Sequence, residues 1–136
     1  MIIGYTQGTF DMFHIGHLNL IKNAKSNCDY LIVGVNTDEL ISSYKSKSAV
    51  IPLEERMAII EAIKYVDKVV PCDTLNKTVA YENLKFNKIF IGDDWKGNPR
   101  WIETENQMSK YGVEVVYLKY TQNTSSTLLR EKLVDY

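Results

Sequence analysis

Five short apolar runs, separated by stretches of helical periodicity, constrain the fold of this chain more than any other feature. The runs cover residues 2–7, 30–36, 68–70, 88–92 and 113–118. The run at 30–36 is continuously apolar, which is typical of a strand covered on both faces. Strands that alternate with helices favour a parallel sheet with right-handed crossovers. The sequence therefore predicts an α/β fold with a doubly wound, five-stranded parallel sheet and helices on both faces.

Four segments that carry polar and charged side chains follow these predicted strands. They cover residues 8–17, 37–47, 92–97 and 119–127. In a Rossmann-like sheet of this kind, ligands bind outside the carboxyl ends of the strands, where the strand order reverses. We therefore expect the four segments to share one site. A length of 136 residues predicts a single domain, 1–136.

Composition limits the classes of partner. The net charge of −1 argues against nucleic-acid binding, which usually requires a basic excess. No apolar run approaches the roughly 20 residues of a membrane helix, and the first residues lack the pattern of a signal peptide. The two cysteines lie far apart in the sequence, as expected of reduced thiols. We therefore expect a cytoplasmic protein without membrane insertion.

The segment 8–17 predicts an anion site at the start of a helix. His14 and His17 are three residues apart, so their side chains share one helix face. The free N–H groups and the positive dipole end of a helix N-terminus favour a phosphate group. Each imidazole could donate a hydrogen bond in its neutral or its protonated form. A zinc site is the less favoured alternative, because it needs three or four ligands and the chain has only these two histidines, with Asp11 as a further candidate.

The segment Gly8-Thr9-Phe10-Asp11, followed by His14-x-Gly16-His17, resembles the nucleotidyltransferase superfamily with the H-x-G-H signature. Within that superfamily, the chain looks most like the small bacterial glycerol-3-phosphate cytidylyltransferases. Further matches follow in order along the chain, at Thr37-Asp38-Glu39, Glu55-Arg56, Tyr65-Val66-Asp67, Gly92-Asp93-Asp94-Trp95 and Ser125-Ser126-Thr127.

This resemblance implies an enzyme that transfers CMP from CTP to glycerol-3-phosphate or a close phospho-alcohol. The products would be pyrophosphate and CDP-glycerol, which serves the synthesis of cell-surface polymers such as teichoic acid or capsule. Mg²⁺ would accompany the triphosphate without a fixed protein site. The resemblance also implies a homodimer.

The resemblance assigns roles to individual residues. The catalytic group comprises His14, His17, Lys45 and Lys47. The nucleotide-binding group comprises Thr9, Phe10, Asp94, Thr121, Ser125, Ser126, Thr127 and Arg130. The acceptor-binding group comprises Asp11, Asp38, Arg56, Lys64 and Trp95.

Three of these assignments compete with simpler interpretations. Lys45 and Lys47 lie in a polar stretch, 42–50, which we expect to be a mobile loop, so both could be solvated lysines. Arg56 could form a salt bridge on a helix surface. Trp95 could be a half-buried packing residue.

One motif departs from the family pattern. Tyr120 and Asn123 stand where the cytidylyltransferases have arginine and glycine. Our hypothesis is that Arg130, one turn into a predicted last helix, supplies the missing cation. The departure keeps two alternatives open: an adenylyltransferase, or a cytidylyltransferase for another small acceptor such as glycerol-2-phosphate or a sugar phosphate. A non-catalytic nucleotide-binding module is a further alternative.

Overall fold

The structure, a computed structural model, describes residues 1–45 and 48–119. They form a sheet of five parallel strands in the order β3-β2-β1-β4-β5. The strands are β1 (Ile3–Gly8), β2 (Tyr30–Asn36), β3 (Lys68–Cys72), β4 (Lys88–Gly92) and β5 (Glu114–Leu118). The predicted five-stranded parallel sheet is thus confirmed.

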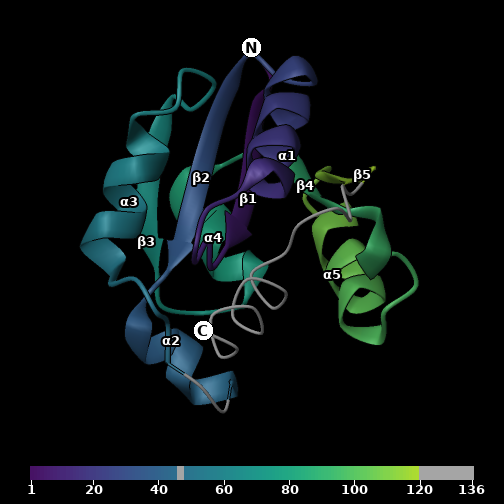
Figure 1. Cartoon of the computed structure of the whole chain (residues 1–136). Helices are drawn as coiled ribbons and strands as arrows, with labels where there is room; N and C mark the ends of the chain where they lie inside the picture. The colour runs from purple at the N-terminus through teal and green to yellow at the C-terminus, as the bar shows by residue number, and fades with distance from the viewer. Residues whose placement is uncertain (46–47, 120–136) are drawn as a thin grey trace.

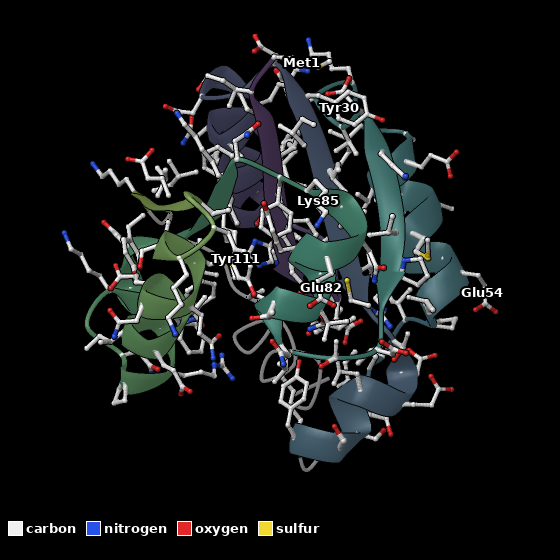
Figure 2. The ribbon with its side chains drawn as sticks, turned by 180° about the vertical axis from the view of Figure 1, so that it is seen from behind. Met1, Tyr30, Glu54, Glu82, Lys85 and Tyr111 are labelled. Atoms are coloured by element: carbon white, nitrogen blue, oxygen red, sulfur yellow. The ribbon has the colours of Figure 1, made fainter. Side chains whose placement is uncertain are left out.

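Helices cover both faces of this sheet. They are α1 (Ile15–Ser26), α2 (Asp38–Tyr44), α3 (Leu53–Glu61), α4 (Lys77–Leu84) and α5 (Pro99–Ser109), with a 3-10 turn, η1 (Asp93–Trp95). Ile21 of α1 and Ile60 of α3 belong to the apolar core on one face, whereas Trp101 and Met108 of α5 belong to the core on the other, with α4 packed against it. Figure 1 shows α1 in front of the strands and α4 behind them, and Figure 2 shows α4 from its own side. The doubly wound arrangement is therefore confirmed.

Two predicted boundaries are wrong. The stretch 42–50 was expected to be a loop, but α2 extends to Tyr44 because Thr37 caps its start and Leu40 and Ile41 are buried. Helix α4 begins after Asn76, whose side chain accepts the N–H of Thr78, whereas the sequence predicts a helix from about residue 75 that is capped by Thr74. The helix predicted after residue 124 lies outside the described residues.

The strand order reverses beside β1. The chain passes from β1 to β2 and β3 on one side, and then returns to β4 and β5 on the other. The segments that follow β1 and β4 therefore diverge at this point, which is where a ligand crevice is expected in an open parallel sheet. The carboxyl ends of the strands point toward α2 at the bottom of Figure 1.

Within residues 1–45 and 48–119, each helix is too short or too polar to cross a membrane.

Candidate active site

The turn between β1 and α1 has an unusual backbone. Phe10 and Met12 adopt positive φ angles of 53° and 48°, a conformation that non-glycine residues rarely take outside functional turns. Between them, the buried carboxylate of Asp11 accepts the backbone N–H groups of Val50 at 2.8 Å and Ile51 at 2.9 Å. Asp11 therefore holds the start of the α3 segment against this turn, and these bonds give it an ordering role at the site.

The two histidines have their Nδ1 atoms turned toward the backbone. His14 caps α1, and its Nδ1 accepts the N–H of Gly16 at 3.0 Å. The Nδ1 of His17 accepts the N–H of His14 at 3.2 Å, and the two rings stack with centroids 3.9 Å apart. Because each Nδ1 accepts a hydrogen bond, the proton of each neutral ring is assigned to Nε2. Both rings therefore present an Nε2–H donor.

The pKa values of both imidazoles lie below the ordinary value of histidine, which favours the neutral form at pH 7. Burial, with a smaller contribution from His14, lowers the pKa of His17 to about 4, although Asp11 acts in the opposite direction. Burial also lowers the pKa of His14. Within the part of the chain that the structure describes, the buried Nε2 of His14 has no hydrogen-bond partner. A buried donor without a partner costs free energy, so this atom is suited to a ligand oxygen.

The hydrogen bonds of Arg56 are made to acceptors of the protein itself. Its side chain is fully buried, and it donates to the carbonyl oxygens of Ile51 at 2.8 Å, Thr9 at 2.7 Å and Asn36 at 2.8 Å. It also forms an ion pair with Asp38 at 2.6 Å. These contacts join the segments after β1 and β2 to the start of α3. This arrangement differs from the expected acceptor contact and from a surface salt bridge, because four of the five N–H groups already have protein acceptors.

The carboxylate of Asp38 is likewise engaged by partners within the protein. Besides the ion pair with Arg56, its carboxylate accepts the backbone N–H of Leu53 at 3.4 Å. The carboxylate therefore orients the guanidinium and the first turn of α3. We infer that Asp38 and Arg56 are positioning residues.

Lys45 lies where α2 ends, next to the β1–α1 turn. The side chain is exposed, and its Nζ lies 5.7 Å from the centroid of the Tyr44 ring. The hydroxyl of Tyr44 lies 3.3 Å from Oγ1 of Thr9 and accepts from Nδ2 of Asn36 at 3.1 Å. Tyr44, which the sequence did not single out, therefore ties the lysine segment to the turn. The candidates Lys47, Thr121, Ser125, Ser126, Thr127 and Arg130 lie outside the described residues.

Phe10 and Trp95 occupy different environments. The Phe10 ring is buried in the core and meets the edge of the His17 ring at 5.5 Å, so it helps to fix that imidazole. Trp95 lies in η1, beside the exposed Asp94, and is 37% exposed. The guanidinium of Arg100 lies 5.2 Å from the centroid of its ring. Trp95 is therefore a surface ring at the carboxyl edge rather than a core residue.

Lys77 is a buried cation at the start of α4 that the sequence analysis did not single out. It is the first residue of α4 and only 8% exposed, and its Nζ donates to the carbonyl oxygen of Leu75 at 3.0 Å. The ammonium lies 5.5 Å from the centroid of the buried Trp101 ring. Burial, with the charge of Arg100, lowers its pKa to about 8. A single lysine at a helix start looks like a solvated residue in the sequence, so no pattern marked it.

Lys64 is not brought to this edge. It lies between α3 and β3, where its Nζ is 5.3 Å from the centroid of the Tyr65 ring. Since the crossover from α3 enters β3 at its amino end, Lys64 lies at the opposite edge of the sheet from the histidines. The expected acceptor contact is thus absent within one chain.

Residues 1–45 and 48–119 contain no group of three or more histidine, cysteine, aspartate or glutamate side chains that could hold a metal ion. The carboxylate of Asp11 already accepts two backbone N–H groups. Asp11, the further ligand that a zinc site at the histidine pair would need, is thus already engaged by the backbone.

The comparisons with known proteins agree with this geometry. The family model described as "Cytidylyltransferase-like" matches residues 5–132. The chain belongs to this cytidylyltransferase-like family. It is 35% identical over 131 residues to the glycerol-3-phosphate cytidylyltransferase of Bacillus subtilis (strain 168), covering 94% of each chain. It is also 35% identical over 129 residues to the enzyme of the same name from Staphylococcus aureus, covering 94% of this chain and 92% of that one.

Among solved structures, the lipopolysaccharide core biosynthesis protein of Thermoplasma volcanium GSS1 has the same fold. The TM-score is 0.75 at 25% identity, over 91% of this chain and 99% of that one. The family relationship therefore extends over nearly the whole cytidylyltransferase-like chain, and the curated relatives are nucleotidyltransferases.

Proposed function

We propose that this cytidylyltransferase-like protein transfers CMP from CTP to glycerol-3-phosphate or a close phospho-alcohol. The products are CDP-glycerol and pyrophosphate. The observation that carries the proposal is the pair of imidazoles at the start of α1, each with its Nδ1 bonded to the backbone and its proton assigned to Nε2. Among the described residues, the buried Nε2 of His14 has no hydrogen-bond partner. The names of the relatives from Bacillus subtilis and Staphylococcus aureus support the choice of nucleotide and acceptor.

The reaction is an in-line displacement at the α-phosphorus of CTP. A phosphate oxygen of the acceptor forms the new bond, and the bond from the α-phosphorus to its bridging oxygen breaks, which releases pyrophosphate. His14 and His17 donate Nε2–H to the non-bridging oxygens of the α-phosphate. Hydrogen bonds that strengthen as charge develops there lower the barrier. Mg²⁺ enters with CTP as part of the substrate.

We assign the remaining candidates to contacts with the nucleotide. Lys45 and Lys47 contact the phosphates of the nucleotide, and Thr9, Asp94 and Thr121 border the nucleotide. Ser125, Ser126, Thr127 and Arg130 supply further donors to the phosphates.

Lys77 holds the phosphate of the acceptor, with Trp95 beside it. Its ammonium lies at the carboxyl edge. Within the described part of the chain, one hydrogen bond engages it and no carboxylate pairs with it. A buried charge that lacks a protein partner is stabilised when a phosphate binds.

The cellular setting follows from these substrates. The enzyme acts in the cytoplasm, where nucleoside triphosphates are available, and supplies CDP-glycerol for a cell-surface polymer such as teichoic acid or capsule. It acts as a homodimer, which light scattering of the purified protein tests directly.

The substitution of Tyr120 for the family arginine favours a second candidate, a transferase that uses ATP or another small phosphorylated acceptor. Pyrophosphate release, measured with Mg²⁺ for CTP and ATP against glycerol-3-phosphate, glycerol-2-phosphate and sugar phosphates, separates the two. Release with CTP and glycerol-3-phosphate is the expected result. Release only with ATP or another acceptor would select the second candidate. Nucleotide binding without release from any pair would identify a binding module.

A further inference from the structure

Arg100 and Lys77 are two cations at the carboxyl edge that have no anionic partner among residues 1–45 and 48–119. Lys77 begins α4, and Arg100 lies in the first turn of α5. The ion pairs found within residues 1–45 and 48–119 are Lys25–Asp67, Arg56–Asp38 and Lys88–Glu114. Neither Lys77 nor Arg100 takes part in any of them, so their charges stay available.

Each of these cations lies over the face of an indole ring. The guanidinium carbon of Arg100 lies 5.2 Å from the ring centroid of Trp95, and Nζ of Lys77 lies 5.5 Å from that of Trp101. Stacking on an aromatic face holds a cation in place without neutralising it. Arg100 is close enough for its charge to contribute to the lowered pKa of Lys77. Two like charges held near each other repel, and an anion between them removes that repulsion.

Hydrogen-bond donors also remain unused in this region. The bond from Lys77 to the carbonyl oxygen of Leu75 engages one of its three N–H groups. In the described part of the chain, the buried Nε1 of Trp101 has no acceptor. No side-chain hydrogen bond from Arg100 to the described residues is present either, so its guanidinium fork is open for a bidentate contact with phosphate.

We propose that Arg100 acts with Lys77 as an anion subsite for the phosphate dianion of the acceptor, so that Arg100 determines acceptor selectivity. The inference rests on the proposed function and deepens it. The subsite prefers a phosphomonoester over a carboxylate or an uncharged alcohol, because a guanidinium and an ammonium together match two negative charges. The nucleotide is bound at the other side of the edge, so its affinity does not depend on Arg100.

The chain carries a built-in reporter for this subsite. Its only two tryptophans, Trp95 and Trp101, both lie beneath the two cations. Their intrinsic emission therefore reports ligand binding at the subsite without turnover. Glycerol-3-phosphate would be titrated into the protein in the absence of nucleotide, with glycerate and glycerol as comparison ligands, and isothermal titration calorimetry would provide an independent measure of Kd.

The test compares Arg100→Gln and Arg100→Lys with a matched control, Lys110→Gln. Lys110 is exposed at the far end of α5, away from the two cations. Its replacement by glutamine removes one positive charge, as Arg100→Gln does. We expect Arg100→Gln to raise Kd for glycerol-3-phosphate by about tenfold or more, and Arg100→Lys to lie between it and the wild type. The control should stay within about twofold of the wild type. Circular dichroism verifies that each variant is folded.

Unchanged binding of glycerol-3-phosphate in Arg100→Gln would overturn the inference, as would a wild-type protein that does not bind it. The two proposals also fail separately. An active wild type whose acceptor KM is unaffected by Arg100→Gln would reject the subsite and leave the proposed function standing. Arg100-dependent binding without pyrophosphate release from CTP would reject the proposed function and retain the subsite.

Discussion

Arg56 and Lys77 are both buried cations near the same edge of the sheet, on opposite faces of it, and they are used differently. Arg56 donates four hydrogen bonds, all to the protein, and pairs with Asp38. Lys77 donates one, to a neighbouring carbonyl, and has no carboxylate partner among the described residues. Burial alone therefore does not separate structural from ligand-binding cations. The two side chains differ instead in the number of hydrogen bonds that they donate to the described residues, four from Arg56 and one from Lys77.

The largest effect is expected on stability, from removing the buried charge of Arg56. Arg56→Gln leaves the carbonyl oxygens of Thr9, Asn36 and Ile51 without their donor, and Asp38 without its ion pair. We expect the free energy of unfolding to fall by about 3–5 kcal/mol, measured by urea denaturation. The adjacent exposed residue provides the control, Glu55→Gln. Equal stability of the two variants would remove the distinction between Arg56 and Lys77.

The next largest effect concerns catalysis on the nucleotide side. His14→Ala should lower kcat about 10²–10³-fold, because the Nε2–H donor to the α-phosphate is lost. Its stability should fall by only about 1 kcal/mol, since the helix loses a cap. Ile15→Ala, an exposed position in the same turn, is the control. If kcat in His14→Ala remained near the wild-type value, the imidazole would not contact the reacting phosphate.

The histidines also predict a pH dependence of stability. The pKa of His17 is about 4 in the folded protein and near 6.5 when unfolded, so between these values the unfolded chain binds a proton that the folded chain does not. Stability is therefore full above about pH 6.5 and falls by about 3 kcal/mol as the pH decreases to 4.

Thermal unfolding between pH 7 and pH 5 measures this slope before most carboxylates titrate. The control is His17→Gln, which carries no titratable group at this position and should show a smaller slope. A wild-type Tm that is constant over this range would contradict the neutral imidazole.

A smaller effect is expected from Lys77, the cation that we propose binds the acceptor phosphate. Lys77→Met removes a buried charge with few protein contacts, so Tm should stay the same or rise. The KM for the acceptor should increase about tenfold with the KM for CTP unchanged, because a phosphate loses its ammonium partner. Steady-state pyrophosphate release at varied acceptor concentration measures both. A loss of stability similar to that of Arg56→Gln would place Lys77 in the scaffold instead.

The smallest effect should come from Tyr44→Phe. The hydroxyl that contacts Thr9 and Asn36 is lost, at a cost of about 1 kcal/mol or less. We expect a decrease in kcat of a few-fold, because Lys45 is then less firmly placed near the β1–α1 turn. Tyr111→Phe, an exposed tyrosine at the far end of α5, should leave kcat unchanged. Identical behaviour of the two variants would exclude a positioning role for Tyr44.

Much of this fold follows from local pattern. The apolar runs predict the five strands because a buried parallel strand must be apolar on both faces, and the spacing of His14 and His17 predicts a shared helix face. The role of Arg56 could not be predicted in this way. Its partner Thr9 is 47 residues away in the sequence, so the contact exists only in the folded chain.

Lys64 and Lys77 also show that sequence patterns do not reveal which residues the fold brings to one edge of the sheet. The sequence pattern selected Lys64, which the crossover into β3 places at the wrong edge of the sheet. It passed over Lys77, which is buried against Trp101, a residue 24 positions further along the chain. In both cases the topology of the crossover connections, rather than the residue type or its neighbours, decides which lysine lies at the carboxyl edge of the sheet.

The protonation state of the histidine pair tests the central claim most directly. The chain contains only His14 and His17, so a long-range ¹H–¹⁵N correlation spectrum of the labelled protein at pH 7 shows two imidazoles without overlap. We predict that both are neutral and carry the proton on Nε2, with Nδ1 as acceptor of a backbone N–H. Imidazolium rings at pH 7, or protons on Nδ1, would contradict the account, because the donors to the α-phosphate would then be wrongly assigned.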